Sequence, residues 1–153
     1  MRRGGPTDPG HCGGSVDAAQ PVCDCLRSNN LTQVRLAGHS YGGMVISQVA
    51  DRMPERIARL VYVNAFVPNP GECLKAMVPP HYKQLFDGLA ALQISKSYLN
   101  CQQDAAMPHS MPWHPRLSER LGLFRLVECQ GSHEIWFTDP AILADALIRA
   151  GRD

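Results

Sequence analysis

The chain has 153 residues, of which 44% are hydrophobic and 19% are charged, and its formal net charge is +1. This length and composition are typical of one globular domain with a buried core, and they exclude a largely disordered chain. The near-zero charge gives no electrostatic reason to expect a nucleic acid or an anionic membrane as a partner.

The N-terminal segment 1–16 is rich in glycine and proline, and we expect it to be a disordered tail. Its basic residues are not followed by the apolar segment of a secretion signal, and no apolar run approaches the ~20 residues of a membrane span. We therefore expect a cytoplasmic protein that does not enter a membrane. The remaining residues, 17–153, are predicted to form a single domain.

The six cysteines lack the paired spacing and accompanying histidines of a zinc site, so we expect free thiols and no metal. Cys101 and Cys129 lie in apolar, strand-like runs, where a reduced cysteine behaves as a small hydrophobe. Cys23 and Cys25 have a spacing that could bind a metal, but no nearby residue completes such a site.

Helix and strand patterns alternate in the first half of the chain. Apolar spacing predicts a helix over 17–27, and the run Gln33–Ala37 predicts a strand. Apolar residues recur at helical spacing from Met44 to Met53, where Pro54 limits the helix. The apolar, β-branched run Arg59–Phe66 is typical of a buried parallel strand.

The second half continues the alternation. Segment 72–94 is weakly amphipathic and is interrupted by two prolines, which predicts short helices that cover another part of the fold. The other expected elements, in chain order, are a strand at Ser97–Cys101, a Pro-rich loop at 107–115, a short helix at 117–121, a strand at Phe124–Cys129 and a helix from Asp139-Pro140 to about Ala150. Asp139 is expected to be the N-cap of that helix. The pattern predicts an α/β fold with a mainly parallel sheet of about four strands flanked by helices.

The pentapeptide Gly38-His39-Ser40-Tyr41-Gly42 matches G-x-S-x-G between the first predicted strand and the next helix. A sharp strand-to-helix turn of this kind, a nucleophile elbow, holds its serine in a strained backbone conformation with the hydroxyl exposed. Gly38 and Gly42 are expected because strand and helix nearly touch there. The backbone N–H of Tyr41 would form half of an oxyanion hole. We expect His39 to be structural, with its side chain pointing away from the hydroxyl.

A serine hydroxyl becomes a good nucleophile when a histidine removes its proton and a carboxylate orients that histidine. In open α/β sheets such groups gather at the carboxyl ends of strands. His133 follows the fourth predicted strand and Asp104 follows the third. The order Ser40, Asp104, His133 is the one expected for an α/β-hydrolase.

Simpler interpretations stay open for each of these residues. Ser40 could be an ordinary turn serine, Asp104 a surface carboxylate and His133 a structural histidine. Asp87 is a less plausible replacement for the acid, and Asp139 is better used as a helix cap. The histidines outside the pattern lie in Pro- or Gly-rich loops and are expected to be solvated: His11, His109 and His114.

Three segments resemble the α/β-hydrolase esterases related to plant methylesterases and hydroxynitrile lyases. They are the stretch 36–72 around Ser40, the block from Tyr98 to Asp104, and the loop Gly131-Ser132-His133. The resemblance covers about 31–147. It implies a partial α/β-hydrolase fold with Ser40 as nucleophile, Asp104 as acid and His133 as base, a small-molecule ester substrate and no cofactor.

The chain departs from this family at its N-terminus, where relatives place several strands before the serine turn. Only 39 residues precede Ser40, so we expect an N-terminally truncated fold. The interval from Ser40 to Asp104 is also short for this family, so segment 72–94 is expected to be a reduced cap. The strand Gln33–Ala37 would then lie at a sheet edge, and the expected outcomes are a homodimer through that edge, aggregation or an incomplete gene model. Loss of one oxyanion donor would slow the reaction roughly 100- to 1000-fold. His11-Cys12-Gly13-Gly14 resembles an oxyanion loop only faintly, and we do not favour it.

The leading functional hypothesis is a serine carboxylic-ester hydrolase that acts through an acyl-enzyme. The main alternative is a truncated, non-catalytic remnant that acts by association or not at all. A hydroxynitrile lyase is less favoured. Those enzymes look to depend on a lysine directly after the histidine, and here Glu134 would oppose a departing cyanide.

Overall fold

The computed structural model describes residues 18–68 and 92–153. Its elements are helices α1 (Gln20–Ser28), α2 (Gly42–Arg52), α4 (Ile135–Thr138) and α5 (Pro140–Gly151), 3-10 helices η1 (Pro54–Arg56) and η3 (Ser118–Leu121), and strands β1 (Val34–Ser40), β2 (Ile57–Ala65), β3 (Ser95–Cys101) and β4 (Arg125–Cys129). The tail predicted at 1–16 and almost all of the cap predicted at 72–94 lie outside the described residues.

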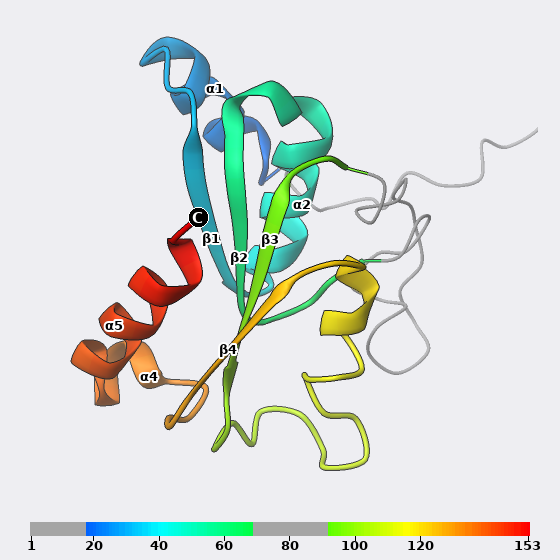
Figure 1. Cartoon of the computed structure of the whole chain (residues 1–153), viewed down its shortest axis with the longest axis vertical. Helices are drawn as coiled ribbons and strands as arrows, with labels where there is room; N and C mark the ends of the chain where they lie inside the picture. Colours follow the sequence, from blue (N-terminus) through cyan, green and yellow to red (C-terminus); the bar gives the residue numbers. More distant parts are fainter. Residues whose placement is uncertain (1–17, 69–91) are drawn as a thin grey trace, which may run out of the picture.

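The four strands form one parallel sheet in the order β1-β2-β3-β4 (Figure 1). Every neighbouring pair is parallel, so the carboxyl ends of all four strands lie along one edge of the sheet. The predicted α/β class with a parallel sheet of about four strands is confirmed. In the described part of the chain β1 is an edge strand, and the homodimer through this edge stays a prediction.

Helices cover both faces of the sheet. Helix α2 packs on β1 and β2 and contacts α1, whereas α5 packs on β2, β3 and β4 (Figure 1). Alternate residues of β2 supply the two cores: Leu60 and Tyr62 belong to the α2 side, and Val61 and Val63 to the α5 side. All four are 3% exposed or less, which explains why the run Leu60–Val63 is apolar on both faces of the sheet.

Polar side chains of the sheet hold the last turn of α5. Arg35 donates a 2.5 Å hydrogen bond to the carbonyl of Gly151, and Ser97 donates one of 2.7 Å to the carbonyl of Ala150. Arg125 donates to the carbonyls of Arg149 and Arg152. Positive groups at this end complement the negative end of the helix dipole and satisfy carbonyls that have no helical partner.

Two local predictions need correction. Helix α4 was not predicted, because its four residues carry no periodic pattern. Asp139 occupies the N-cap position of α5, but its side chain makes no capping hydrogen bond. Instead, the Asp139 backbone joins the two helices: its N–H donates to the carbonyl of Ile135 and its carbonyl accepts from Leu143.

Candidate active site

Strand β1 ends at Ser40, and α2 begins two residues later at Gly42. Ser40 has a φ of 52°, in the left-handed region that costs a non-glycine residue about 1 to 3 kcal/mol. Neighbouring elements hold this conformation: the Ser40 carbonyl accepts a 3.1 Å hydrogen bond from the N–H of Phe66, and the Tyr41 carbonyl accepts one of 2.9 Å from Met44. The turn between β1 and α2 is therefore strained at the serine.

Close packing around this turn depends on Gly38 and Gly43. A Cβ on Gly38 would lie 2.5 Å from the carbonyl oxygen of Gly42, as the sequence predicts. A Cβ on Gly43 would lie 2.2 Å from the carbonyl oxygen of Phe66, whereas one on Gly42 would meet no described atom within 4 Å. The backbones of Gly38 and Gly42 do approach closely, but the expectation that position 42 itself needs a glycine is wrong. The first turn of α2 directs Gly43, not Gly42, towards the end of β2.

Asp104 and His133 lie side by side beyond the ends of β3 and β4. The Nδ1 atom of His133 is 2.6 Å from Oδ2 of Asp104, and the side chains are 18% and 1% exposed, respectively. The N–H of Ala106 donates to the other carboxylate oxygen at 2.8 Å. Burial alone would raise the pKa of Asp104, but hydrogen bonds from Asn64, His133 and Ala106 outweigh it and hold this pKa below its ordinary value.

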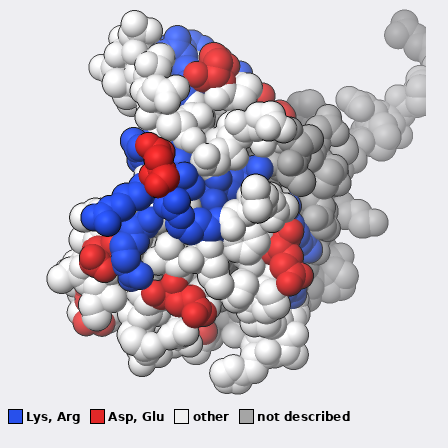
Figure 2. Space-filling model, in the orientation of Figure 1, with Lys and Arg blue, Asp and Glu red and all other residues white. Residues whose placement is uncertain are grey.

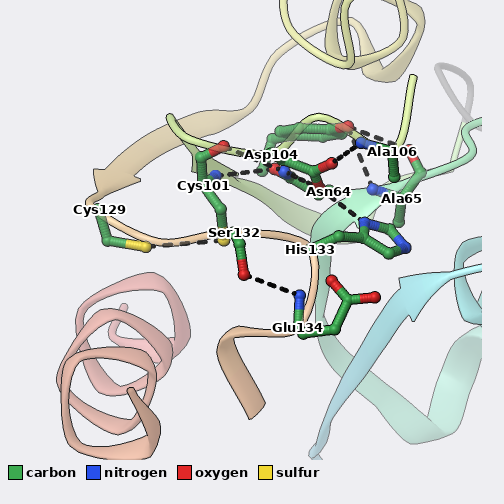
Figure 3. A network of polar contacts seen from close by, with 10 residues as sticks. Asn64, Ala65, Cys101, Asp104, Ala106, Cys129, Ser132, His133 and Glu134 are labelled. Atoms are coloured by element: carbon green, nitrogen blue, oxygen red, sulfur yellow. Dashed lines mark hydrogen bonds and ion pairs between the residues drawn. The ribbon is translucent and has the colours of Figure 1, made fainter. Parts of the chain in front are cut away.

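Asn64, at the end of β2, is a site residue that the sequence reasoning missed. It is fully buried, and its φ is 33°. Its amide donates to Oδ2 of Asp104 at 2.5 Å and to the carbonyl of Cys101 at 3.2 Å, and its oxygen accepts from the N–H of Cys101 at 2.8 Å (Figure 3). Asn64 therefore fixes both the end of β3 and the carboxylate that follows it. An asparagine within an otherwise apolar strand is the signal that could have revealed it.

Two rings pack against the imidazole of His133. The ring centroid of His39 is 4.3 Å away, and the indole of Trp113 is stacked at 5.5 Å with an interplanar angle of 9°. Burial, and secondly the proximity of His133, lower the pKa of His39, whose buried Nε2 has no hydrogen-bond partner in the described structure. Because His39 adjoins Ser40, the contact between His39 and His133 brings the serine turn close to the loop that carries His133. The direction of the His39 side chain relative to the serine hydroxyl stays a prediction.

The surroundings of the other histidines agree only in part with the sequence-based expectations. His109 is exposed, as expected, but His114 is half-buried and its Nδ1 lies 2.6 Å from the hydroxyl of Ser118, so its predicted solvation is wrong. Residues His11 and Asp87 lie outside the described ranges.

The cysteines of the described ranges are all free thiols: Cys25 is exposed, and Cys23, Cys101 and Cys129 are buried. Within 18–68 and 92–153 no group of His, Cys, Asp and Glu side chains is arranged to hold a metal.

The carboxyl edge of the sheet thus gathers a strained serine turn, a carboxylate–imidazole pair and a buried amide. An imidazole that is paired with a carboxylate is suited to general acid–base chemistry. A comparison with family models matches residues 4–150 to the alpha/beta hydrolase family. The chain belongs to this family.

Known relatives agree with this assignment. The chain is 52% identical to a carbendazim hydrolyzing esterase from Nocardioides sp. (strain SG-4G) over 58 residues, which are 38% of this chain and 24% of that esterase. The structure of the present chain is similar to that of an extracellular alpha/beta-hydrolase from a Paenibacillus species, with a TM-score of 0.79 and 26% identity. The match covers 97% of this chain and 86% of the Paenibacillus chain. That hydrolase is described as sharing structural and functional homology with tobacco salicylic acid binding protein 2.

A pyrethroid hydrolase from Sphingobium faniae JZ-2 shares the fold, with a TM-score of 0.67, 20% identity, and coverage of 94% of this chain and 81% of that one.

In the described ranges, no helix combines the length and apolarity that crossing a bilayer requires. The cytoplasmic location stays a prediction.

Proposed function

We propose that this α/β-hydrolase is a serine carboxylic-ester hydrolase that acts through an acyl-enzyme, with Ser40 as nucleophile, His133 as general base and Asp104 as the acid that orients it. The observation that carries the proposal is the 2.6 Å contact between His133 and Asp104 beside the strained turn at Ser40. The partial match to a carbendazim hydrolyzing esterase supports ester hydrolysis.

In the first half-reaction, Ser40 Oγ attacks the ester carbonyl carbon while Nε2 of His133 accepts the hydroxyl proton. The charged carboxylate of Asp104 keeps the other imidazole proton on Nδ1 and stabilises the imidazolium. Collapse of the tetrahedral intermediate breaks the bond to the alcohol, which takes the proton from His133. The acyl group stays on Ser40.

In the second half-reaction, a water molecule attacks the acyl carbon and gives its proton to His133, and the carboxylic acid leaves as the proton returns to Ser40. The backbone N–H of Tyr41, at the N-cap of α2, would donate to the oxyanion in both steps. This N–H belongs to the N-terminal end of a helix, where backbone donors have no helical partner.

The test is labelling of the purified protein with a fluorophosphonate probe, together with turnover of a chain-length series of p-nitrophenyl esters. Ser40→Ala should abolish labelling and lower kcat/KM by more than about 1000-fold. Ser28→Ala, which alters an exposed serine at the end of α1, is the matched control and should behave as the wild type. Carbendazim belongs in the substrate panel because of the partial match.

Well-folded protein that neither labels nor turns over esters would contradict the proposal and favour the non-catalytic alternative. The lyase alternative predicts cyanide release from mandelonitrile. The residue after His133 is the exposed Glu134, whose negative charge is unsuited to a departing cyanide, and this favours the esterase.

A further inference from the structure

A cavity of about 450 Å³ lies at the opposite end of the sheet from Ser40. It is formed by the amino-terminal ends of strands β2, β3 and β4, and its lining residues are Arg59, Leu92, Gln93, Ile94, Ser95, Lys96, Leu123, Phe124 and Arg125. Lys96 and Cys101 are five residues apart on β3, which corresponds to about 17 Å along a strand. The cavity is therefore separate from the carboxyl edge that holds Asp104 and His133.

The charge lining this cavity is entirely positive. It comprises the guanidinium groups of Arg59 and Arg125 and the ammonium group of Lys96, with no carboxylate among the described lining residues. The carboxylate of Asp153 lies 4.0 Å from the guanidinium of Arg59. Because the side chain of Asp153 is 80% exposed, this ion pair compensates the charge of Arg59 only weakly. Figure 2 shows lysine and arginine side chains as a continuous patch beside the C-terminal end of the chain.

Two of these cations are more than nine-tenths buried and incompletely paired. Arg59 donates to the hydroxyl of Ser97 at 3.2 Å, but its buried Nε has no hydrogen-bond partner in the described structure. Lys96 carries three N–H donors and reaches one described protein acceptor, the carbonyl of Leu92, at 3.1 Å. Burial lowers the pKa of both groups, and the proximity of Arg125 lowers that of Arg59 further.

Holding the end of helix α5 accounts for Arg59 in part, through its contacts with Ser97 and Asp153, but it does not account for Lys96. The hydrogen bonds to the last turn of that helix come from Arg35, Ser97 and Arg125. Lys96 has donors without a described protein acceptor, and no carboxylate lies among the described lining residues, so a ligand that supplies acceptor oxygens and negative charge would be stabilised in this cavity. The donors of Arg59 and Lys96 therefore favour an anion.

The rest of the wall combines the polar residues Gln93 and Ser95 with four apolar side chains. Ile94 is buried, Phe124 is half-buried and Leu123 is 94% exposed. The volume lies within the range of small-molecule sites and exceeds what a single inorganic anion fills. We infer that this cavity, the Arg59–Lys96 pocket, is a second binding site for a small organic anion, whose phosphate or carboxylate group contacts Arg59 and Lys96 and whose apolar part packs on Phe124.

Isothermal titration calorimetry of the full chain with phenyl phosphate, benzoate, inorganic phosphate and neutral benzyl alcohol tests this inference. Phenyl phosphate, benzoate or both should bind saturably at one site, more tightly than inorganic phosphate, and benzyl alcohol should not bind. Lys96→Met should weaken the anion at least about tenfold, because it removes one charge-assisted contact. Arg27→Gln removes an exposed charge of α1 and is the matched control, with affinity unchanged.

Arg125→Gln, at the partly exposed side of the pocket, is a second variant in case Lys96→Met fails to fold, and it should weaken binding in the same direction. Fluorophosphonate labelling of Ser40 should be unchanged in Lys96→Met, so the two sites are tested separately. The inference is overturned if no organic anion binds, if inorganic phosphate binds as tightly as phenyl phosphate, or if folded Lys96→Met and Arg125→Gln bind like the wild type.

Discussion

Asn64 donates a 2.5 Å hydrogen bond to the same oxygen of Asp104 that faces Nδ1 of His133. The amide of Asn64 and the imidazole of His133 thus share one oxygen of the Asp104 carboxylate (Figure 3). In the proposed mechanism Asn64 is a positioning residue, because it acts on the substrate only through Asp104 and His133.

Replacement of Asn64 by glycine should therefore lower kcat about tenfold while KM stays nearly constant. Without the amide, the pKa of Asp104 rises, so the acid limb of the kcat profile should move to higher pH. The measurement is a pH series of initial rates with a p-nitrophenyl ester. Asn64→Ala separates this effect from backbone strain, since glycine tolerates the φ of 33° and alanine does not. Equal kcat in Asn64→Gly and wild type would contradict the positioning role.

The two adjacent glycines at the start of α2 should respond oppositely to alanine. Gly43→Ala places a Cβ within 2.2 Å of a backbone oxygen and should lower the free energy of unfolding by about 2 to 3 kcal/mol. Gly42→Ala meets no described atom and should leave this free energy unchanged or raise it by up to about 1 kcal/mol. Urea unfolding followed by circular dichroism measures both. Equal losses in the two variants would show that the packing at Gly43 is not the cause.

His39 should make the fold sensitive to mild acid. Its pKa in the folded state lies below the ordinary value of 6.5, so the unfolded chain binds the proton more tightly. The stability that neutral His39 contributes is present above 6.5 and is lost as the pH falls below that value. His39→Gln, which does not titrate, should show a smaller decline of the unfolding free energy over this window. A decline as steep as that of the wild type would assign the effect to other groups.

Thiol reactivity should follow burial. Cys25 is exposed and should react with a thiol reagent in the native protein, whereas Cys101 and Cys129 should react only after unfolding. Burial also raises the pKa of both buried thiols, which lowers the thiolate population that reacts. Peptide mapping by mass spectrometry after timed labelling distinguishes the sites. Labelling of Cys101 at the rate of Cys25 would contradict the described packing.

The sequence was sufficient for the sheet because apolar runs such as Leu60–Val63 have few alternatives to a buried strand. It was also sufficient for proposing Asp104 and His133, since residues after parallel strands meet at one edge. Asn64 and Trp113 could not be predicted in the same way. Their roles depend on contacts with residues 20 or more positions away, and their local patterns are those of a strand and a Pro-rich loop. The sequence predicted that position 42 needs a glycine, whereas the structure shows this need at position 43. The rotation of α2 about its axis decides which Cβ faces the end of β2, and the local sequence does not give that rotation.

Both tryptophans of the chain lie against histidines of the candidate site: Trp113 is stacked on His133, and Trp136 is 5.6 Å from His39. A protonated imidazole quenches the fluorescence of a neighbouring indole, so the emission of Trp136 should follow the protonation of His39. The protein thereby carries its own optical titration signal, which can be read without substrate and in an inactive Ser40→Ala variant.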